Sequence, residues 1–112
     1  MTTTAKPLFV AKYAENAITQ QYPCPASART IIDKFTGTNT SAAVATLSVY
    51  IVPSSGSAGA SNQITVTKSL AVGEVYTFPE IVGQVLSGGE FISTLASAAS
   101  AIVIRASGRE IT

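Results

Sequence analysis

The chain has 112 residues, a net charge of +1, no histidine and a single cysteine. Its length predicts one domain, and an apolar share of 46% with only 12% charged residues excludes intrinsic disorder. One cysteine excludes an intrachain disulfide, and the lack of histidine excludes Ser-His-Asp and Cys-His catalytic sites.

Apolar and polar residues alternate along most of the chain, which is the pattern of half-buried strands. Turn signals rich in Gly, Pro, Ser and Asn separate the alternating segments. The segment 81–86 fits a strand or a short helical turn, and Ala-rich stretches at 42–45 and 95–101 leave a helix open there. We expect strands at eight ranges, which are 6–13, 16–22, 28–36, 43–53, 62–69, 74–79, 89–96 and 101–111.

The predicted fold is all-β, with the strands in a single antiparallel β-sandwich that is Ig-like or jelly-roll-like. The sandwich is expected over residues 8–112. Residues 1–7 hold three threonines, one lysine and Pro7, so we expect a flexible N-terminal arm that extends along a neighbour in an assembly. The start lacks the basic and long apolar stretches of a secretory signal, and no apolar run has the roughly 18–20 residues of a membrane span.

The residues that could carry chemistry do not form a recognisable site. The six carboxylates are too scattered for an EF-hand-like ligand cluster, and we expect solvated turn positions more than a glycosidase pair. Cys24 stands between two prolines and is expected to be a small buried residue. The sequence therefore predicts a protein that is not an enzyme and uses no cofactor or metal.

The seven cations are scattered and nearly balanced, which predicts neither a nucleic-acid nor a membrane partner. We expect contacts to a protein partner instead, and we expect the attachment to survive about 1 M NaCl because so few charges are available. The candidates for such contacts are two threonines and a lysine of the arm and the outward-facing aromatic of the central strand. A small strip of arginines on the last strand is a further candidate and is either solvated or partner-facing. These predicted contact residues are Thr3, Thr4, Lys6, Tyr50, Arg105 and Arg109.

Four segments carry a resemblance to a known group of proteins. They are ATLSVYIVPSSGSAGASN (45–62), LAVGEVY (70–76), VLSGGEFI (85–92) and IVIRASGRE (102–110). Their succession resembles small β-sandwich virion proteins of tailed bacteriophages, over residues 28–110. The resemblance concerns strands and loops, and it transfers no active-site residue.

The resemblance implies a structural role at the surface of a virion assembled in the host cytoplasm. It points to a cement or decoration protein that binds the outside of a phage head, with the major capsid protein or another virion protein as partner. A homo-oligomer, dimer or trimer, is expected. The alternative is a neck, tail or fibre-associated module that recognises a host-surface glycan.

Overall fold

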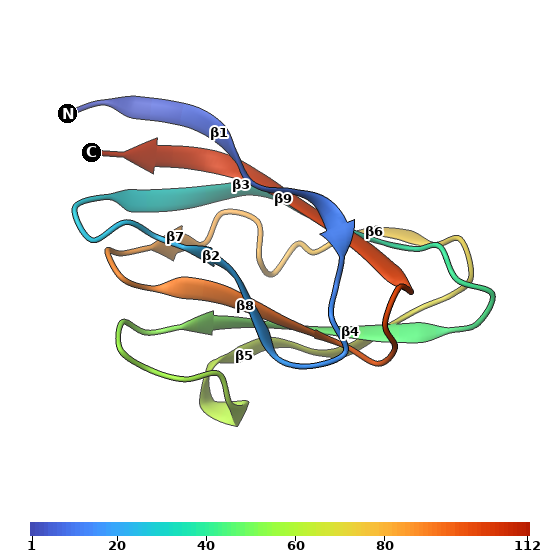
Figure 1. The fold of residues 1–112 in the computed structure, drawn as a ribbon. Coiled ribbons are helices and arrows are strands. Elements are labelled where there is room, and N and C mark those ends of the chain that lie inside the picture. Colours follow the sequence, from blue (N-terminus) through green and yellow to red (C-terminus); the bar gives the residue numbers. More distant parts are fainter.

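The computed structural model describes all 112 residues and contains nine strands and one 3-10 turn (Figure 1). The single helical element is the turn η1, and no helix is long and apolar enough to cross a membrane. The elements are β1 (Thr3–Tyr13), β2 (Thr19–Pro23), β3 (Arg29–Asn39), β4 (Ala45–Val52), η1 (Ala60–Asn62), β5 (Gln63–Leu70), β6 (Val75–Thr77), β7 (Val85–Leu86), β8 (Phe91–Ala96) and β9 (Ile102–Ile111).

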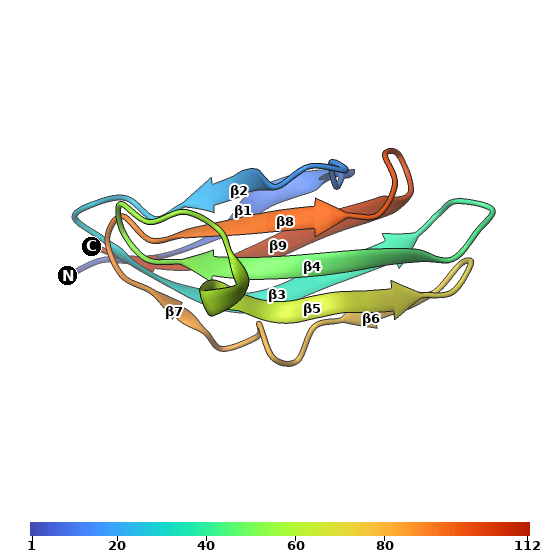
Figure 2. The same ribbon diagram turned by 90° about the horizontal axis from the view of Figure 1, so that it is seen from below.

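The strands form two antiparallel sheets that pack face to face (Figure 1 and Figure 2). Sheet 1 has the order β1-β9-β3-β6, with β7 also paired to β3, and sheet 2 has the order β2-β8-β4-β5. The chain crosses repeatedly between the sheets and its first and last strands are neighbours, an arrangement found in jelly rolls. The predicted all-β sandwich is confirmed, and β7 identifies the segment 81–86 as a turn followed by a short strand.

The core lies between the sheets and is built from the inward-facing residue of each alternating pair. Ile32, Leu47, Ile92 and Ile104 have no exposed surface. An edge-to-face series of rings runs through it, from Phe9 to Phe35 to Phe78 to Tyr76, with centroids 5.8, 5.3 and 4.8 Å apart. Such aromatic contacts add to the free energy gained by burying the rings.

The structure corrects the prediction that residues 1–7 lie outside the fold as an arm. Residues 3–7 belong to β1 and pair with residues 107–111 of β9, and Thr2 and Thr112 exchange two backbone hydrogen bonds of 2.9 Å. The two chain ends therefore lie side by side (Figure 1). The partner strand comes from the far end of the chain, so the local composition gave no sign of this pairing. The first core side chain is still Leu8, because residues 3–7 bury little surface.

Candidate functional site

A cluster of polar side chains joins the two sheets near the chain ends. The phenol of Tyr22 on β2 donates a hydrogen bond to the Glu110 carboxylate on β9, and its oxygen lies 2.8 Å from the Thr30 hydroxyl on β3. Because the single phenol proton goes to the carboxylate, Thr30 donates to the phenol oxygen. The ammonium group of Lys6 on β1 lies 3.3 Å from the same carboxylate. The Glu110 carboxylate and the Tyr22 phenol thus link four strands from both sheets.

The surroundings of this cluster keep Glu110 ionised and Tyr22 protonated. The hydrogen bond from Tyr22 and the nearby Lys6 lower the pKa of Glu110 below its ordinary value. Burial, and then the hydrogen bond to Glu110, raise the pKa of Tyr22. Neither group is therefore poised to exchange a proton near neutral pH, which suits a structural link better than acid–base catalysis.

The contacts of ionised Glu110 with Tyr22 and Lys6 predict that the free energy of unfolding decreases in acid. Its pKa is lowered on folding, so its contribution is present above the unfolded pKa near 4.5 and is lost as the pH falls through the folded value. Urea unfolding near pH 7 should show Glu110→Gln to be less stable than the wild type, and the gap should narrow as the pH falls below about 4.5. The matched variant Glu15→Gln removes a more exposed carboxylate, and we expect a smaller gap. A gap for Glu110→Gln that persists unchanged in acid would contradict this assignment.

A second polar network lies at the other end of β1. The Glu15 carboxylate accepts hydrogen bonds from Lys12 at 2.8 Å and from Gln21 at 2.9 Å, and Gln21 also donates to Thr94 at 2.9 Å. The Lys12 contact lowers the pKa of Glu15. This network joins β1 to β2 and β8, so it also serves the packing of the two sheets.

The structure corrects the placement of Tyr50 as an exposed anchor. Tyr50 does lie outside the main core cluster, on the parity that the sequence predicts, but it is only 5% exposed. Val52, two residues further along the same face of β4, is fully buried as well. The loop between β4 and β5 contains η1, which packs against β4. Burial of a residue on the outer face of a sheet depends on loops that pack there, and the alternation of residues along a strand does not predict it.

The other predicted contact residues all lie in sheet 1. Thr3 and Thr4 are exposed on β1, and Lys6 is held by Glu110. Arg105 and Arg109 are exposed on the outer face of β9, and the Arg109 guanidinium lies 3.0 Å from the carboxylate of Asp33 on β3. Contact with a partner stays a prediction for these residues.

Two further cations share the outer face of sheet 1 with these arginines. Arg29 and Lys34 are exposed on β3, opposite Ile111 and Ser107 of β9. The sequence could not group them with Arg105, because only the β3–β9 register places them on one face. Directly opposite residues in an antiparallel pair lie on the same side of the sheet.

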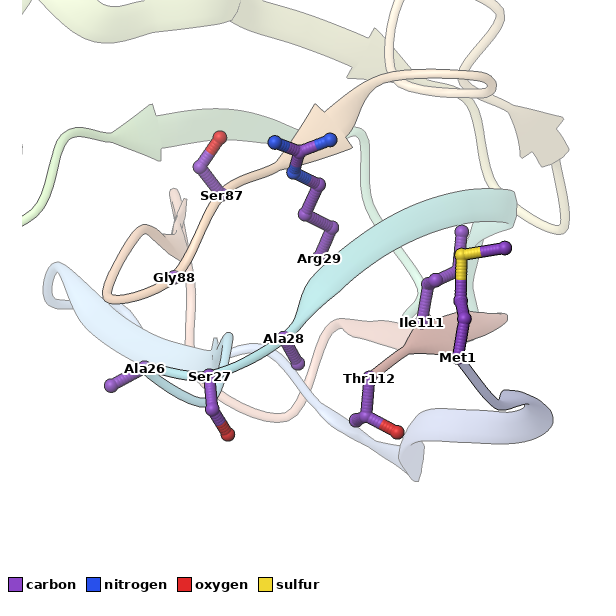
Figure 3. Close-up of a pocket in the computed structure, with 9 residues that line it drawn as sticks. All are labelled: Met1, Ala26, Ser27, Ala28, Arg29, Ser87, Gly88, Ile111 and Thr112. Atoms are coloured by element: carbon purple, nitrogen blue, oxygen red, sulfur yellow. The ribbon is translucent and has the colours of Figure 1, made fainter.

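One hollow of about 470 Å³ lies at the end of sheet 1 where the chain termini meet (Figure 3). Figure 3 shows Arg29 and Ser87 on one side of it and Met1, Ile111 and Thr112 on the other. Arg29 is the only lining residue with a charged side chain. No group of three or more His, Cys, Asp or Glu side chains is placed to hold a metal ion anywhere in the structure.

Comparison with known proteins shows similarity at the level of the fold. No family model and no curated protein matches the sequence. Among solved structures, the chain is similar to Bacillus endospore appendages, described as a novel family of disulfide-linked pili, with a TM-score of 0.58 and 12% identity over 99% of this chain and 88% of that one.

Structures of infectious bursal disease virus, strains Gx and Gt, also match. Both have TM-scores of 0.47, identities are 12% and 8%, and the match covers 97% of this chain. It covers 31% and 32% of the viral chains, so this chain spans about a third of their length.

Proposed function

We propose that this chain is a non-enzymatic structural protein of a bacteriophage particle, of the cement or decoration kind that binds the outer surface of the head. The proposal rests on the sequence resemblance to small phage virion proteins. It also rests on the observation that the carboxylates and the single thiol have partners within the chain. The fold shared with a pilus structure is compatible with it.

The observation that carries the proposal is that each of the six carboxylates has a partner within the chain. Four accept hydrogen bonds from side chains, of which three also form ion pairs, and two accept a backbone N–H across a tight turn. The acceptors and donors are Glu15 with Lys12, Asp33 with Arg109, Glu80 with Thr65, Glu110 with Tyr22, Glu74 with the Ala71 N–H and Glu90 with the Ser87 N–H. Groups engaged in this way stabilise turns and sheet packing.

The single thiol is also engaged in packing. Cys24 is 3% exposed, its sulfur lies 3.5 Å from the carbonyl oxygens of Ala28 and Leu86, and Thr30 lies 3.2 Å away. A buried thiol of this kind is inert toward a neighbouring chain. We therefore propose that the protein binds its partners, including further copies of itself in a dimer or trimer, without covalent links.

Copy number in purified particles tests this proposal. The expected result is that the chain co-purifies with phage heads at roughly hundreds of copies per particle, because a decoration protein follows the repeated surface of the shell. Quantitative mass spectrometry against the major capsid protein measures this ratio. A value of roughly three to eighteen copies would instead assign the protein to the neck or tail, and absence from particles would overturn the virion role.

A further inference from the structure

The charged side chains without a partner inside the chain are confined to three cations. Every carboxylate is engaged, as described above, and four of the seven cations are engaged too. Those four are Lys6 at 3.3 Å from Glu110, Lys12 at 2.8 Å from Glu15, Arg109 at 3.0 Å from Asp33, and Lys68 at 4.4 Å from the Tyr76 ring centroid. The remaining three cations, Arg29, Lys34 and Arg105, have no ion pair or side-chain hydrogen bond.

All three unpaired cations lie on the outer face of sheet 1. Along β3 the inward residues are buried, and Arg29 lies on the exposed side. The register irregularity between Ile32 and Lys34 shifts the alternation by one residue, so Lys34 lies on that side as well. Arg105 pairs with Thr36 of β3, which lies on that side as well. The three cations extend over roughly 20 Å along β3, given a rise of about 3.3 Å per residue. By contrast, the strands of sheet 2 carry one charged residue, Lys68.

This face also carries exposed apolar side chains next to its cations. Tyr13 lies on β1 opposite the half-buried Val103 of β9, while Val75 and Val85 flank β3 on its other side. Tyr13, Val75 and Val85 are 49%, 66% and 51% exposed. Arginine, tyrosine and apolar side chains on one surface are typical of the composition of protein interfaces.

The arrangement of the cations indicates the kind of partner that this face can bind. Lys34 and Arg105 are diagonal neighbours across the β3–β9 pair, at a typical separation of about 7–8 Å. Their like charges repel each other, and the carboxylate nearest to Lys34 in sequence, Asp33, is already ion-paired with Arg109. A negative charge from outside the chain would lower this repulsion. A second copy presenting the same face would bring a surface with the same excess of positive charge, which disfavours self-association through this surface.

We propose that the outer face of sheet 1 docks against an acidic surface of a different protein, with Arg29, Lys34 and Arg105 as the charged contacts. The identification of that partner as another virion protein rests on the proposed function, while the docking face itself does not. Three cations can neutralise only about three phosphates of duplex DNA, so the logarithm of the binding constant would fall with the logarithm of salt concentration with a slope of about −2.7. So few phosphate contacts give too little affinity for DNA at physiological salt. Because salt screens this contact, we expect the attachment to weaken as the NaCl concentration rises, in place of the salt-resistant attachment expected from the low charge.

The experiment is an NMR titration of the ¹⁵N-labelled protein with poly-L-glutamate as a carboxylate-bearing polypeptide probe, at about 50 and about 500 mM NaCl. Parallel titrations use a duplex DNA oligonucleotide and vesicles of phosphatidylcholine and phosphatidylserine. The test variant is Lys34→Gln/Arg105→Gln. Its matched control is Gln20→Glu/Ser69→Glu, at exposed positions of sheet 2, and both double variants change the net charge by −2, from +1 to −1.

We expect poly-L-glutamate to shift amide signals of β3 and β9 at low salt, with little shift at high salt. The Lys34→Gln/Arg105→Gln variant should bind about five- to tenfold more weakly, and the control should stay within about twofold of the wild type. Far-UV circular dichroism and melting temperature verify that both variants are folded.

Three results would overturn the docking face. They are no shift with poly-L-glutamate at low salt, an equal loss of affinity in both double variants, and tighter binding to DNA or vesicles than to poly-L-glutamate. The titration needs no particles, so its failure leaves the copy-number test of the virion role standing. Conversely, a protein absent from particles that still binds poly-L-glutamate through β3 and β9 would keep the docking face and remove the virion partner.

Discussion

Replacing Phe35 by alanine is expected to lower the free energy of unfolding by about 3–5 kcal/mol. Phe35 has no exposed surface and lies at the centre of the ring series, in edge-to-face contact with Phe9 and Phe78. Alanine leaves a cavity that close-packed neighbours fill only in part. Since a domain of this kind is stable by about 5–15 kcal/mol, the variant should approach the limit of folding. Urea unfolding followed by circular dichroism measures the loss.

A matched variant separates the loss of the ring from a general effect of truncation. Val66 is 65% exposed on β5, so Val66→Ala should change stability by less than about 0.5 kcal/mol. Phe35→Leu, which keeps most of the volume, should fall between the two. A Phe35→Ala variant within about 1 kcal/mol of the wild type would contradict the position of the core described here.

Gly108→Ala is expected to destabilise the protein by about 3 kcal/mol, the upper part of the usual range for overpacking. A Cβ atom at Gly108 would lie 2.2 Å from the carbonyl oxygen of Ile31 and 3.3 Å from the Cα atom of Ile32. Both atoms belong to the backbone of β3, beside the register irregularity between Ile32 and Lys34, so no side-chain rotation relieves the clash. The two central strands of sheet 1 would have to separate locally.

Gly59 supplies the control for this substitution. It has an extended backbone with φ of −169°, and a Cβ atom there would meet no atom within 4 Å. Gly59→Ala should therefore be neutral or stabilise slightly, through the smaller entropy of the unfolded chain. Thermal unfolding of both variants measures the difference, and equal melting temperatures would show that β3 and β9 approach less closely than described.

The fold class and most of the strand positions could be predicted from the sequence because they depend on short-range alternation. All eight predicted strands correspond to strands of the structure, with ends shifted by a few residues. The flexible arm is the exception. The pairing of residues 3–7 depends on residues 107–111, about a hundred positions away, and composition contains no information about such a contact.

The candidate contact surface could likewise be predicted from the sequence only in part. The sequence identified Arg105 and Arg109 as a pair on one strand face, because two-residue periodicity defines a face. It could not add Arg29 and Lys34, nor recognise that Lys6 is neutralised by Glu110, because both depend on strand register.

The sequence by itself determined which reactive groups this protein has, namely no histidine, one cysteine and few charged residues. It also determined the alternation of apolar and polar residues that gives half-buried strands in a β-sandwich. The tertiary structure decided which of those charges remain unpaired and where they gather, and it decided that Tyr50 is buried. The physical reason is that periodicity acts over a few residues, whereas ion pairs, loop coverage and sheet order join residues from opposite ends of the chain.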